Sequence, residues 1–334
     1  MQARFTRLAV LVVALGMATA GCGKYSISNI RSLMAFQDGN NLYRKAEYKA
    51  AIEHYEQAVQ HNPDLGFAYF FLGNSYDNLY KPAKKGQPDN DANLPKAVEA
   101  YRTAIQKMAN ATDPKEQEIR KLTYEFLIAA YGPEKLNDFA QAEPVARQLI
   151  DLEPNEPSNY QLLGKLYEDQ GRFDEAEATF KKAIEMRPND PLGYQILAGY
   201  YNRQGQFENT MDAFQKRAAI EPNNPEAWHT IASYIWDKVQ RDKSLPKNKQ
   251  LEYLLAGIAA DDKALSINPE YYEALTYKNI LLRMQANVEP AKQKQLIEEA
   301  DRLRNKAIEV KKKQDIDAAA AAAAPTPAGA KKGK

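Results

Sequence analysis

The 334-residue chain has few of the residues that form disulfides, metal sites and catalytic centres. It contains one cysteine and three histidines. A single cysteine excludes an intramolecular disulfide. His54, His61 and His229 do not stand in a His/Cys/carboxylate pattern with metal-ligand spacing, so we expect no metal site. The sequence also lacks a Gly-x-Ser-x-Gly elbow, a His-Glu-x-x-His pair and a phosphate-binding Gly-rich loop. These absences predict a protein that is not an enzyme and binds no small-molecule cofactor.

Neither sign of charge is in excess, and long hydrophobic runs are scarce. Lys and Arg number 45 against 44 Asp and Glu, for a formal net charge of +1, which gives no electrostatic bias toward nucleic acid. One hydrophobic run extends from Leu8 to about Ala20, after Arg4 and Arg7. It is shorter than the roughly 20 residues of a membrane-spanning helix. A run of this length after basic residues is typical of a secretory signal peptide.

The only cysteine, Cys22, lies directly after this run. The sequence Thr19-Ala-Gly-Cys resembles a bacterial lipoprotein signal, in which small residues precede a cysteine that receives diacylglycerol and becomes the new N-terminus. The resemblance implies removal of residues 1–21, a lipid on Cys22 that attaches the chain to a membrane, and a tether over residues 22–31. It places the protein in the bacterial cell envelope, and Gly23 is compatible with the outer membrane, facing the periplasm. The alternative is a secreted or signal-anchored protein without lipidation.

A 34-residue period organises the middle of the chain. Pro154, Pro188 and Pro222 are evenly spaced at this interval. Between the first two, large and small side chains recur at helical spacing on both sides of Gly171. The first set is Tyr160, Leu163, Gly164 and Tyr167, and the second is Ala176, Phe180 and Ala183. The small residues allow two helices to approach closely, while the rings fill the remaining groove. Each period is therefore predicted to be a pair of antiparallel helices.

This pattern resembles the tetratricopeptide repeat. Weaker copies extend the resemblance to about six or seven repeats over residues 32–313. Two copies carry polar insertions, at residues 81–95 and 240–249, and residues 314–334 form an Ala/Pro/Lys-rich tail that we expect to be disordered. The resemblance implies an all-α fold, a right-handed α-solenoid of stacked TPR helix hairpins whose concave side is lined by the first helix of each pair.

Two polar residues depart from the pattern. Arg217 stands where the family usually has Ala, and Asp261 stands where a large ring is usual. Because a buried guanidinium needs a partner, we expect Arg217 to extend its head to solvent.

The concave groove is the predicted site for a protein or peptide partner. By carry-over from the family, the groove-facing residues are Phe36, Asn40, Tyr43, Phe67, Phe70, Asn74, Gln161, Lys165, Asn202, Arg203, His229 and Trp236. Four of these, Phe36, Tyr43, Phe67 and Phe70, would form an exposed aromatic patch that marks a binding site. The alternative is that residues 27–33 or the first insertion cover these rings as core.

A second contact site is predicted from His229 and Trp236. The two residues are seven positions apart on one expected helix, so they share a face. Packing of Trp236 against the neighbouring insertion is the alternative.

Together these observations predict a non-enzymatic adaptor for protein–protein interaction, anchored through Cys22, in bacterial envelope assembly or secretion. The competing hypothesis is an envelope ligand-binding or hydrolytic protein whose site is built by the two insertions. Residues 81–95 and 240–249 contain no catalytic set, which disfavours it.

Overall fold

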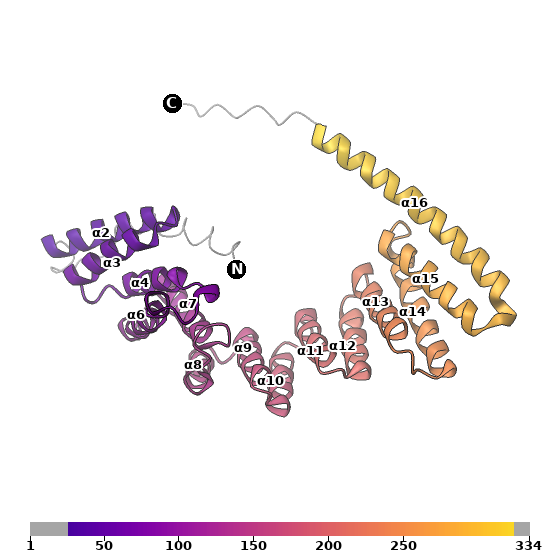
Figure 1. Cartoon of the computed structure of the whole chain (residues 1–334), viewed down its shortest axis with the longest axis horizontal. Coiled ribbons are helices and arrows are strands. Elements are labelled where there is room, and N and C mark those ends of the chain that lie inside the picture. Colours follow the sequence, from indigo (N-terminus) through magenta and orange to yellow (C-terminus); the bar gives the residue numbers. More distant parts are fainter. Residues whose placement is uncertain (1–25, 324–334) are drawn as a thin grey trace. The chain divides into compact units, whose positions relative to one another are not determined.

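The computed structural model describes residues 26–323, and this part of the chain contains helices and no β-strand. Fourteen longer helices follow one another as seven hairpins, shown in chain order in Figure 1. The first four pairs are α2 (Ile27–Arg44) with α3 (Tyr48–His61), α4 (Gly66–Leu79) with α6 (Asn93–Lys107), α7 (Pro114–Tyr131) with α8 (Phe139–Leu152), and α9 (Pro157–Asp169) with α10 (Phe173–Met186). The remaining pairs are α11 (Pro191–Arg203) with α12 (Phe207–Ile220), α13 (Pro225–Arg241) with α14 (Lys247–Ile267), and α15 (Tyr272–Val288) with α16 (Gln293–Ala323). The prediction of an all-α fold of stacked TPR hairpins is confirmed.

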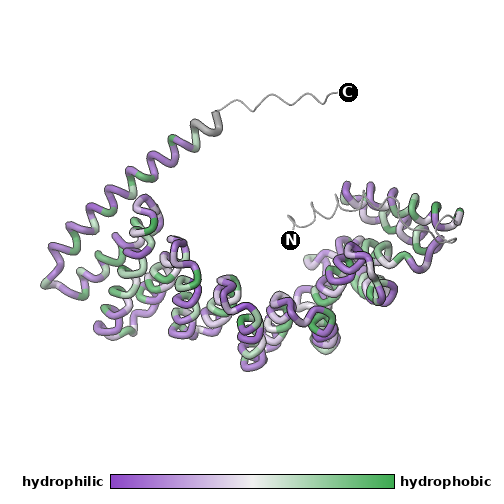
Figure 2. Tube along the Cα trace, turned by 180° about the vertical axis from the view of Figure 1, so that it is seen from behind, coloured by the Kyte–Doolittle hydropathy of each residue, from purple (hydrophilic) through white to green (hydrophobic). Residues whose placement is uncertain are grey.

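The chain divides into two compact units, residues 1–179 and 180–334, and the division falls within α10. We call them unit 1 and unit 2 and describe each by itself. Figure 2 shows that hydrophobic and hydrophilic positions alternate along the helices of both units, as amphipathic helices require.

Helix starts carry the 34-residue period. Pro157, Pro191 and Pro225 each occupy the first turn of a first helix, where the missing N–H of proline costs no hydrogen bond. The residue before each proline caps the helix by accepting a hydrogen bond from the backbone N–H two residues on. These caps are Glu156, Asp190 and Asn224. The period in the sequence is therefore a repeated helix-start signal.

The turns inside the hairpins carry the same period. Asn137, Gly171 and Gly205 have φ values of 52°, 71° and 71° and are spaced 34 residues apart. This left-handed conformation is open to glycine and, at small cost, to asparagine. Each of these residues reverses the chain before the second helix of its hairpin begins.

Glycines in the first helices of unit 1 make close contact with tyrosines of the second helices. A Cβ atom on Gly39 would lie 2.7 Å from the Tyr55 ring, and one on Gly73 would lie 2.8 Å from the Tyr101 ring. Both tyrosine rings are fully buried. A larger residue at either glycine would push the two helices of the hairpin apart.

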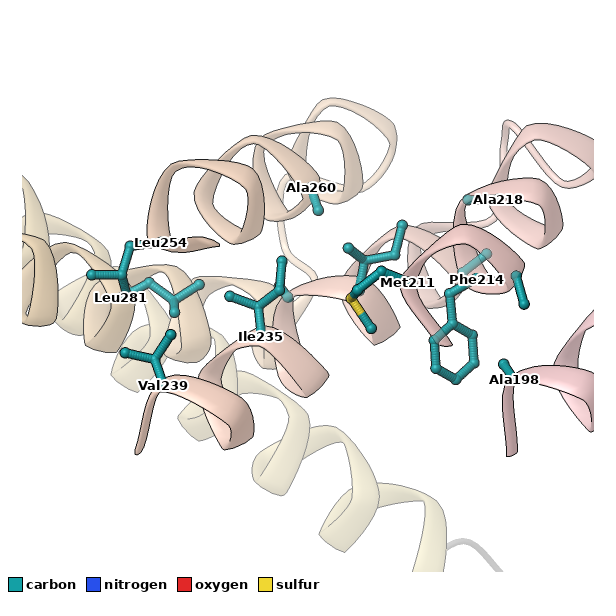
Figure 3. Close-up of a cluster of buried hydrophobic side chains, with 13 residues drawn as sticks. Ala198, Met211, Phe214, Ala218, Ile235, Val239, Leu254, Ala260 and Leu281 are labelled. Carbon is teal, nitrogen blue, oxygen red and sulfur yellow. The ribbon is translucent and has the colours of Figure 1, made fainter. Parts of the chain in front are cut away.

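The core of unit 2 is mainly aliphatic. Figure 3 shows Met211 of α12 beside Ile235 of α13, with Phe214 of α12 toward Ala198 of α11 and with Leu254 of α14 and Leu281 of α15 on the other side of Ile235. One continuous cluster thus connects consecutive hairpins, which is how stacked repeats stabilise one another.

The two insertions form more helix than the sequence predicts. Residues 81–95 contain a 3-10 turn (Pro82–Lys84), the short helix α5 (Pro88–Asp91) and the start of α6. Around residues 240–249, α13 continues to Arg241 and α14 begins at Lys247. The second insertion therefore lengthens both helices of the sixth hairpin and leaves only a short connection.

Arg217 corrects a prediction. Its side chain is buried in unit 2 and does not reach solvent. Its guanidinium instead pairs with Glu221 at 3.0 Å and with Glu226 at 2.8 Å. Both carboxylates are partly exposed, so they meet the buried cation while remaining hydrated. These two nearby carboxylates are sufficient to keep the guanidinium of Arg217 buried.

The described chain differs from the predicted boundaries at both ends. Helix α2 begins at Ile27, inside the segment predicted as a tether, and α16 continues to Ala323, beyond residue 313. Alanine has the highest helix propensity, which explains why residues 314–323 continue the helix rather than starting a disordered tail. The predicted signal peptide, Cys22 and the end of the tail lie outside the described residues. Among residues 26–323, no helix has both the length and the apolar character needed to span a bilayer.

Candidate functional site

Helix α13 places His229 and Trp236 on one face. Asn224 caps the helix by accepting a hydrogen bond from the Glu226 backbone N–H at 3.0 Å, and Pro225 follows it. Since an α-helix rises 1.5 Å per residue, the seven-residue separation places the two side chains about 10 Å apart along the axis. The predicted pairing of these residues on one helix face is observed.

Tyr277 of α15 lies between these two side chains. Its ring centroid is 4.9 Å from that of His229 and 5.4 Å from that of Trp236, with interplanar angles of 81° and 76°. Edge-to-face contacts of this kind contribute about 0.5–1.5 kcal/mol beyond burial of area. Trp236 and Tyr277 both remain partly exposed. We call His229, Trp236 and Tyr277 the His229 face.

Asp261 of α14 supports this face from behind. Its side chain is fully buried, and its Oδ1 atom lies 2.9 Å from Nδ1 of His229. The other carboxylate oxygen has no hydrogen-bond partner in the described part of the chain. Burial raises the pKa of Asp261 to about 6, against the opposing effect of the hydrogen bond with His229. The contact fixes the orientation of the imidazole ring relative to α13.

The His229 face offers aromatic contacts to a partner. The rings of Trp236 and Tyr277 present apolar area with a rigid geometry, which is the composition of interface hot spots. His229 itself was predicted to face the groove but is buried, with Asp261 on one side and the ring of Tyr277 on the other, so its imidazole supports these rings from beneath. No group of three or more His, Cys, Asp or Glu side chains within residues 26–323 is arranged to hold a metal ion.

Sequence reasoning missed Asp261 and Tyr277 as members of this site. Asp261 stands at a position where the repeat usually has a ring, so a carboxylate buried there requires a partner. His229 is the residue opposite it in the hairpin. The pairing of Asp261 with His229 could therefore be predicted from the sequence. The contact of Tyr277 with His229 could not, because Tyr277 belongs to the next hairpin.

The aromatic patch predicted in unit 1 is corrected by the structure. Phe36, Phe67 and Phe70 are buried, and Phe70 is only 1% exposed. The ring of Phe36 contacts that of Phe67 at 4.8 Å, and the ring of Phe70 contacts that of Tyr101 at 6.2 Å. Rings of the second helices and of neighbouring hairpins fill the space that the prediction left to a partner, so these phenylalanines are core.

Predicted polar residues near these rings hold the first two hairpins together. Asn40 accepts a hydrogen bond from the Tyr55 hydroxyl at 2.8 Å. Asn74 is buried, and its Oδ1 atom accepts hydrogen bonds from the Tyr43 hydroxyl and from Asn78. Burial raises the pKa of Tyr43. The Asn74 side chain is thus used in hydrogen bonds within the protein, and Tyr43 is half-buried.

The other predicted groove residues lie on the surface or close to it. Lys165 is exposed and pairs with Asp169 on the same helix, and Gln161 beside it is half-buried. Asn202 and Arg203 are exposed at the end of α11. The first two belong to unit 1 and the last two to unit 2. Each unit therefore keeps some first-helix side chains accessible.

Comparison with known proteins supports the fold. Residues 135–199 match the family model for the tetratricopeptide repeat. The chain is similar in structure to the C-terminal part of a TPR repeat-containing protein from Cytophaga hutchinsonii, with 16% identity, a TM-score of 0.51, and coverage of 82% of this chain and 98% of that one. This likeness shows the fold alone.

Two further structures match with lower TM-scores. MamA from Desulfovibrio magneticus RS-1 has 15% identity and a TM-score of 0.42, covering 57% of this chain and 95% of that one. YrrB, described as a TPR protein with an unusual peptide-binding site, has 18% identity and a TM-score of 0.39, covering 60% and 91%. No curated protein sequence matches the chain.

Proposed function

We propose that this chain is a non-enzymatic interaction adaptor that binds a protein or peptide partner along its first helices. The observation that carries the proposal is the His229 face. Two consecutive first helices, α13 and α15, contribute the rings of Trp236 and Tyr277, which are partly exposed and contact each other. Trp236 also packs against the core of unit 2, which holds its ring in place. A partly exposed tryptophan and tyrosine in contact with each other give a rigid surface for a partner.

The proposal includes the cell envelope as the place of action. The Thr19-Ala-Gly-Cys sequence after an apolar run supports a lipid on Cys22, and several acyl chains give stable membrane attachment. The adaptor then acts in envelope assembly or secretion from the periplasmic face of the outer membrane. The balance of 45 basic and 44 acidic residues disfavours nucleic acid as the partner.

A crosslinking experiment tests the binding surface. Full-length protein is crosslinked in the native envelope, and the partner is identified from the wild type by mass spectrometry. Trp236→Ala is then expected to reduce recovery of that partner by about tenfold or more, as truncation of a hot spot does. Leu255→Ala is the matched control, because Leu255 is an exposed apolar residue of the same unit on a second helix. Equal recovery from both variants would contradict the proposed surface.

A separate experiment tests the anchor. Cys22→Ala is expected to abolish incorporation of a labelled fatty acid and to release the protein from the membrane fraction. Undiminished fatty-acid labelling of this variant would contradict lipidation at Cys22 and would leave the binding surface untouched.

A further inference from the structure

The start of α2 exposes an apolar stripe that the hairpin does not use. Ten large hydrophobic residues are exposed in the described part of the chain, and four of them lie between Ile27 and Met34. Ile27, Ile30 and Met34 follow the i, i+3, i+7 spacing of a single helix face, and Leu33 lies beside them. Ile27 is 71% exposed and Met34 is 61% exposed. We call Ile27, Ile30 and Met34 the α2 stripe.

The opposite face of α2 already forms the contact with α3. Ser32, Phe36 and Gly39 are buried on that side, and the Ser32 hydroxyl donates a hydrogen bond to the Ala58 carbonyl at 2.7 Å. The exposed stripe is therefore additional apolar surface rather than part of the hairpin core.

The stripe is short and ends in polar residues. Arg31 is exposed between Ile27 and Met34 on the same side of the helix. In the next turn, the continuation of this side carries Gln37 and Asp38, which are exposed. The apolar character is thus confined to the first two turns of α2, and one cation accompanies it.

The distance from Cys22 limits where this stripe can lie. Only four peptide units separate Cys22 from Ser26, which caps α2. Since an extended chain spans at most about 3.6 Å per residue, this segment reaches no more than about 14 Å. A lipid on Cys22, as in the proposed function on which this inference rests, would hold the first turns of α2 next to the headgroups of the same membrane.

We propose that the α2 stripe binds the surface of the bilayer that holds the Cys22 lipid. Ile27, Ile30 and Met34 enter the boundary between headgroups and acyl chains, and Arg31 extends its guanidinium to the lipid phosphates. The polar residues from Gln37 onward mark where the helix leaves the membrane surface. The lipid and the stripe then form two linked attachments, which orient α2 on the membrane where a lipid alone leaves it free to rotate.

A fluorescent label on single cysteines tests the contact. The thiol of Cys22 is consumed by lipidation, so Ile30→Cys and Leu255→Cys can each be labelled alone with an environment-sensitive dye in the full-length lipidated protein. The two positions are matched, because Ile30 is 48% exposed and Leu255 is 47% exposed. The proteins are reconstituted in vesicles of phosphatidylethanolamine and phosphatidylglycerol that contain a nitroxide-labelled lipid as quencher. Asp38→Cys is the control on α2 itself.

The label at position 30 is expected to shift to the blue and to be quenched several-fold more strongly than the labels at 38 and 255. Equal quenching at all three positions would overturn the proposal. A blue shift at position 30 without quenching by lipid would also overturn it, since a second copy or another protein would then cover the stripe. Fatty-acid labelling of the same samples separates the two claims: lipid incorporated at Cys22 with a water-exposed label at 30 contradicts only the stripe, whereas absent lipid contradicts the anchor.

Discussion

The first two hairpins and the sixth carry different side chains at the same two positions of the repeat. The first two hairpins have two aromatic rings there, and the sixth has a histidine and an aspartate. One position lies three residues before the small residue of the first helix, and the other lies three residues before an alanine of the second helix. The pairs at these positions are Phe36 with Tyr55, Phe70 with Tyr101, and His229 with Asp261. In unit 1 two rings pack together, whereas in unit 2 an imidazole binds a buried carboxylate.

The difference teaches that the partner across the hairpin decides what a first-helix residue does. Tyr55 and Tyr101 are large enough to close the space above Phe36 and Phe70, so both phenylalanines become core. Asp261 is smaller and polar, so His229 turns toward it, and Tyr277 of the next hairpin covers the imidazole. Trp236 and Tyr277, the partly exposed pair of contacting rings, lie in unit 2.

The largest effect is expected from Phe70→Ala in the aromatic core of unit 1. The side chain is 1% exposed and contacts the rings of Phe71, Tyr101 and Phe126. Truncation should lower the free energy of unfolding by about 3–5 kcal/mol, measured by urea denaturation. Phe173→Ala, at an exposed phenylalanine of the same unit, should change it by no more than about 0.5 kcal/mol. A Phe70→Ala variant that keeps its stability and loses only partner binding would contradict this prediction. It would support the earlier hypothesis that Phe70 belongs to an exposed binding patch.

The next effect is the pH dependence that the buried carboxyl group of Asp261 in the sixth hairpin contributes. Burial raises the pKa of Asp261 from 3.8 to about 6, while His229 and Lys278 lower it and Asp262 raises it. A carboxyl with a raised pKa gives its full contribution to stability below about pH 4 and loses it as the pH rises to about 6. Over this range the wild type should lose about 3 kcal/mol relative to Asp261→Asn, which cannot ionise.

Urea midpoints measured between pH 4 and pH 7 give this difference. Asp212→Asn is the control, because Asp212 is an exposed carboxylate of the same unit. Parallel stability curves for the wild type and Asp261→Asn would show that the buried carboxyl does not titrate as its surroundings require.

A double-mutant cycle makes the comparison direct by converting the sixth hairpin to the unit 1 pair. His229→Phe alone leaves the buried carboxylate of Asp261 without its hydrogen bond, and Asp261→Tyr alone leaves the imidazole without its own. Each should cost about 1–3 kcal/mol. The double variant pairs two rings and should lose less than the sum of the single losses. Additive losses would mean that the two positions do not face each other in solution.

The smallest effect is expected at the exposed first-helix residues. Lys165→Ala removes the ion pairs of an exposed lysine with Asp169 and, at 3.6 Å, with Glu168, so the free energy of unfolding should change by no more than about 1 kcal/mol. Asn74→Ala, at a buried side chain that accepts two hydrogen bonds, should cost about 1–3 kcal/mol in the same assay. Similar losses for both variants would remove the distinction between accessible and buried groove positions.

The sequence by itself determined the repeat. Prolines at helix starts, left-handed residues in the turns and small residues at the close contact are local requirements, and they recur every 34 residues where the chain folds back. Such signals depend on a few neighbouring residues, so the all-α hairpin fold followed from them. The helices that begin at Pro157, Pro191 and Pro225 are examples, because each start depends only on the proline and the capping residue before it.

The tertiary structure decided which side chains are exposed. Phe36, Phe70 and His229 have the same place in the repeat and are all buried, and nothing adjacent to them in the chain says whether a ring or a carboxylate packs against them. Their burial depends on the volume and polarity of Tyr55, Tyr101 and Asp261, and on rings that arrive from the next hairpin, such as Tyr277. Exposure is a property of packing between segments distant in sequence, and for that reason the period predicted the hairpins but not the binding face.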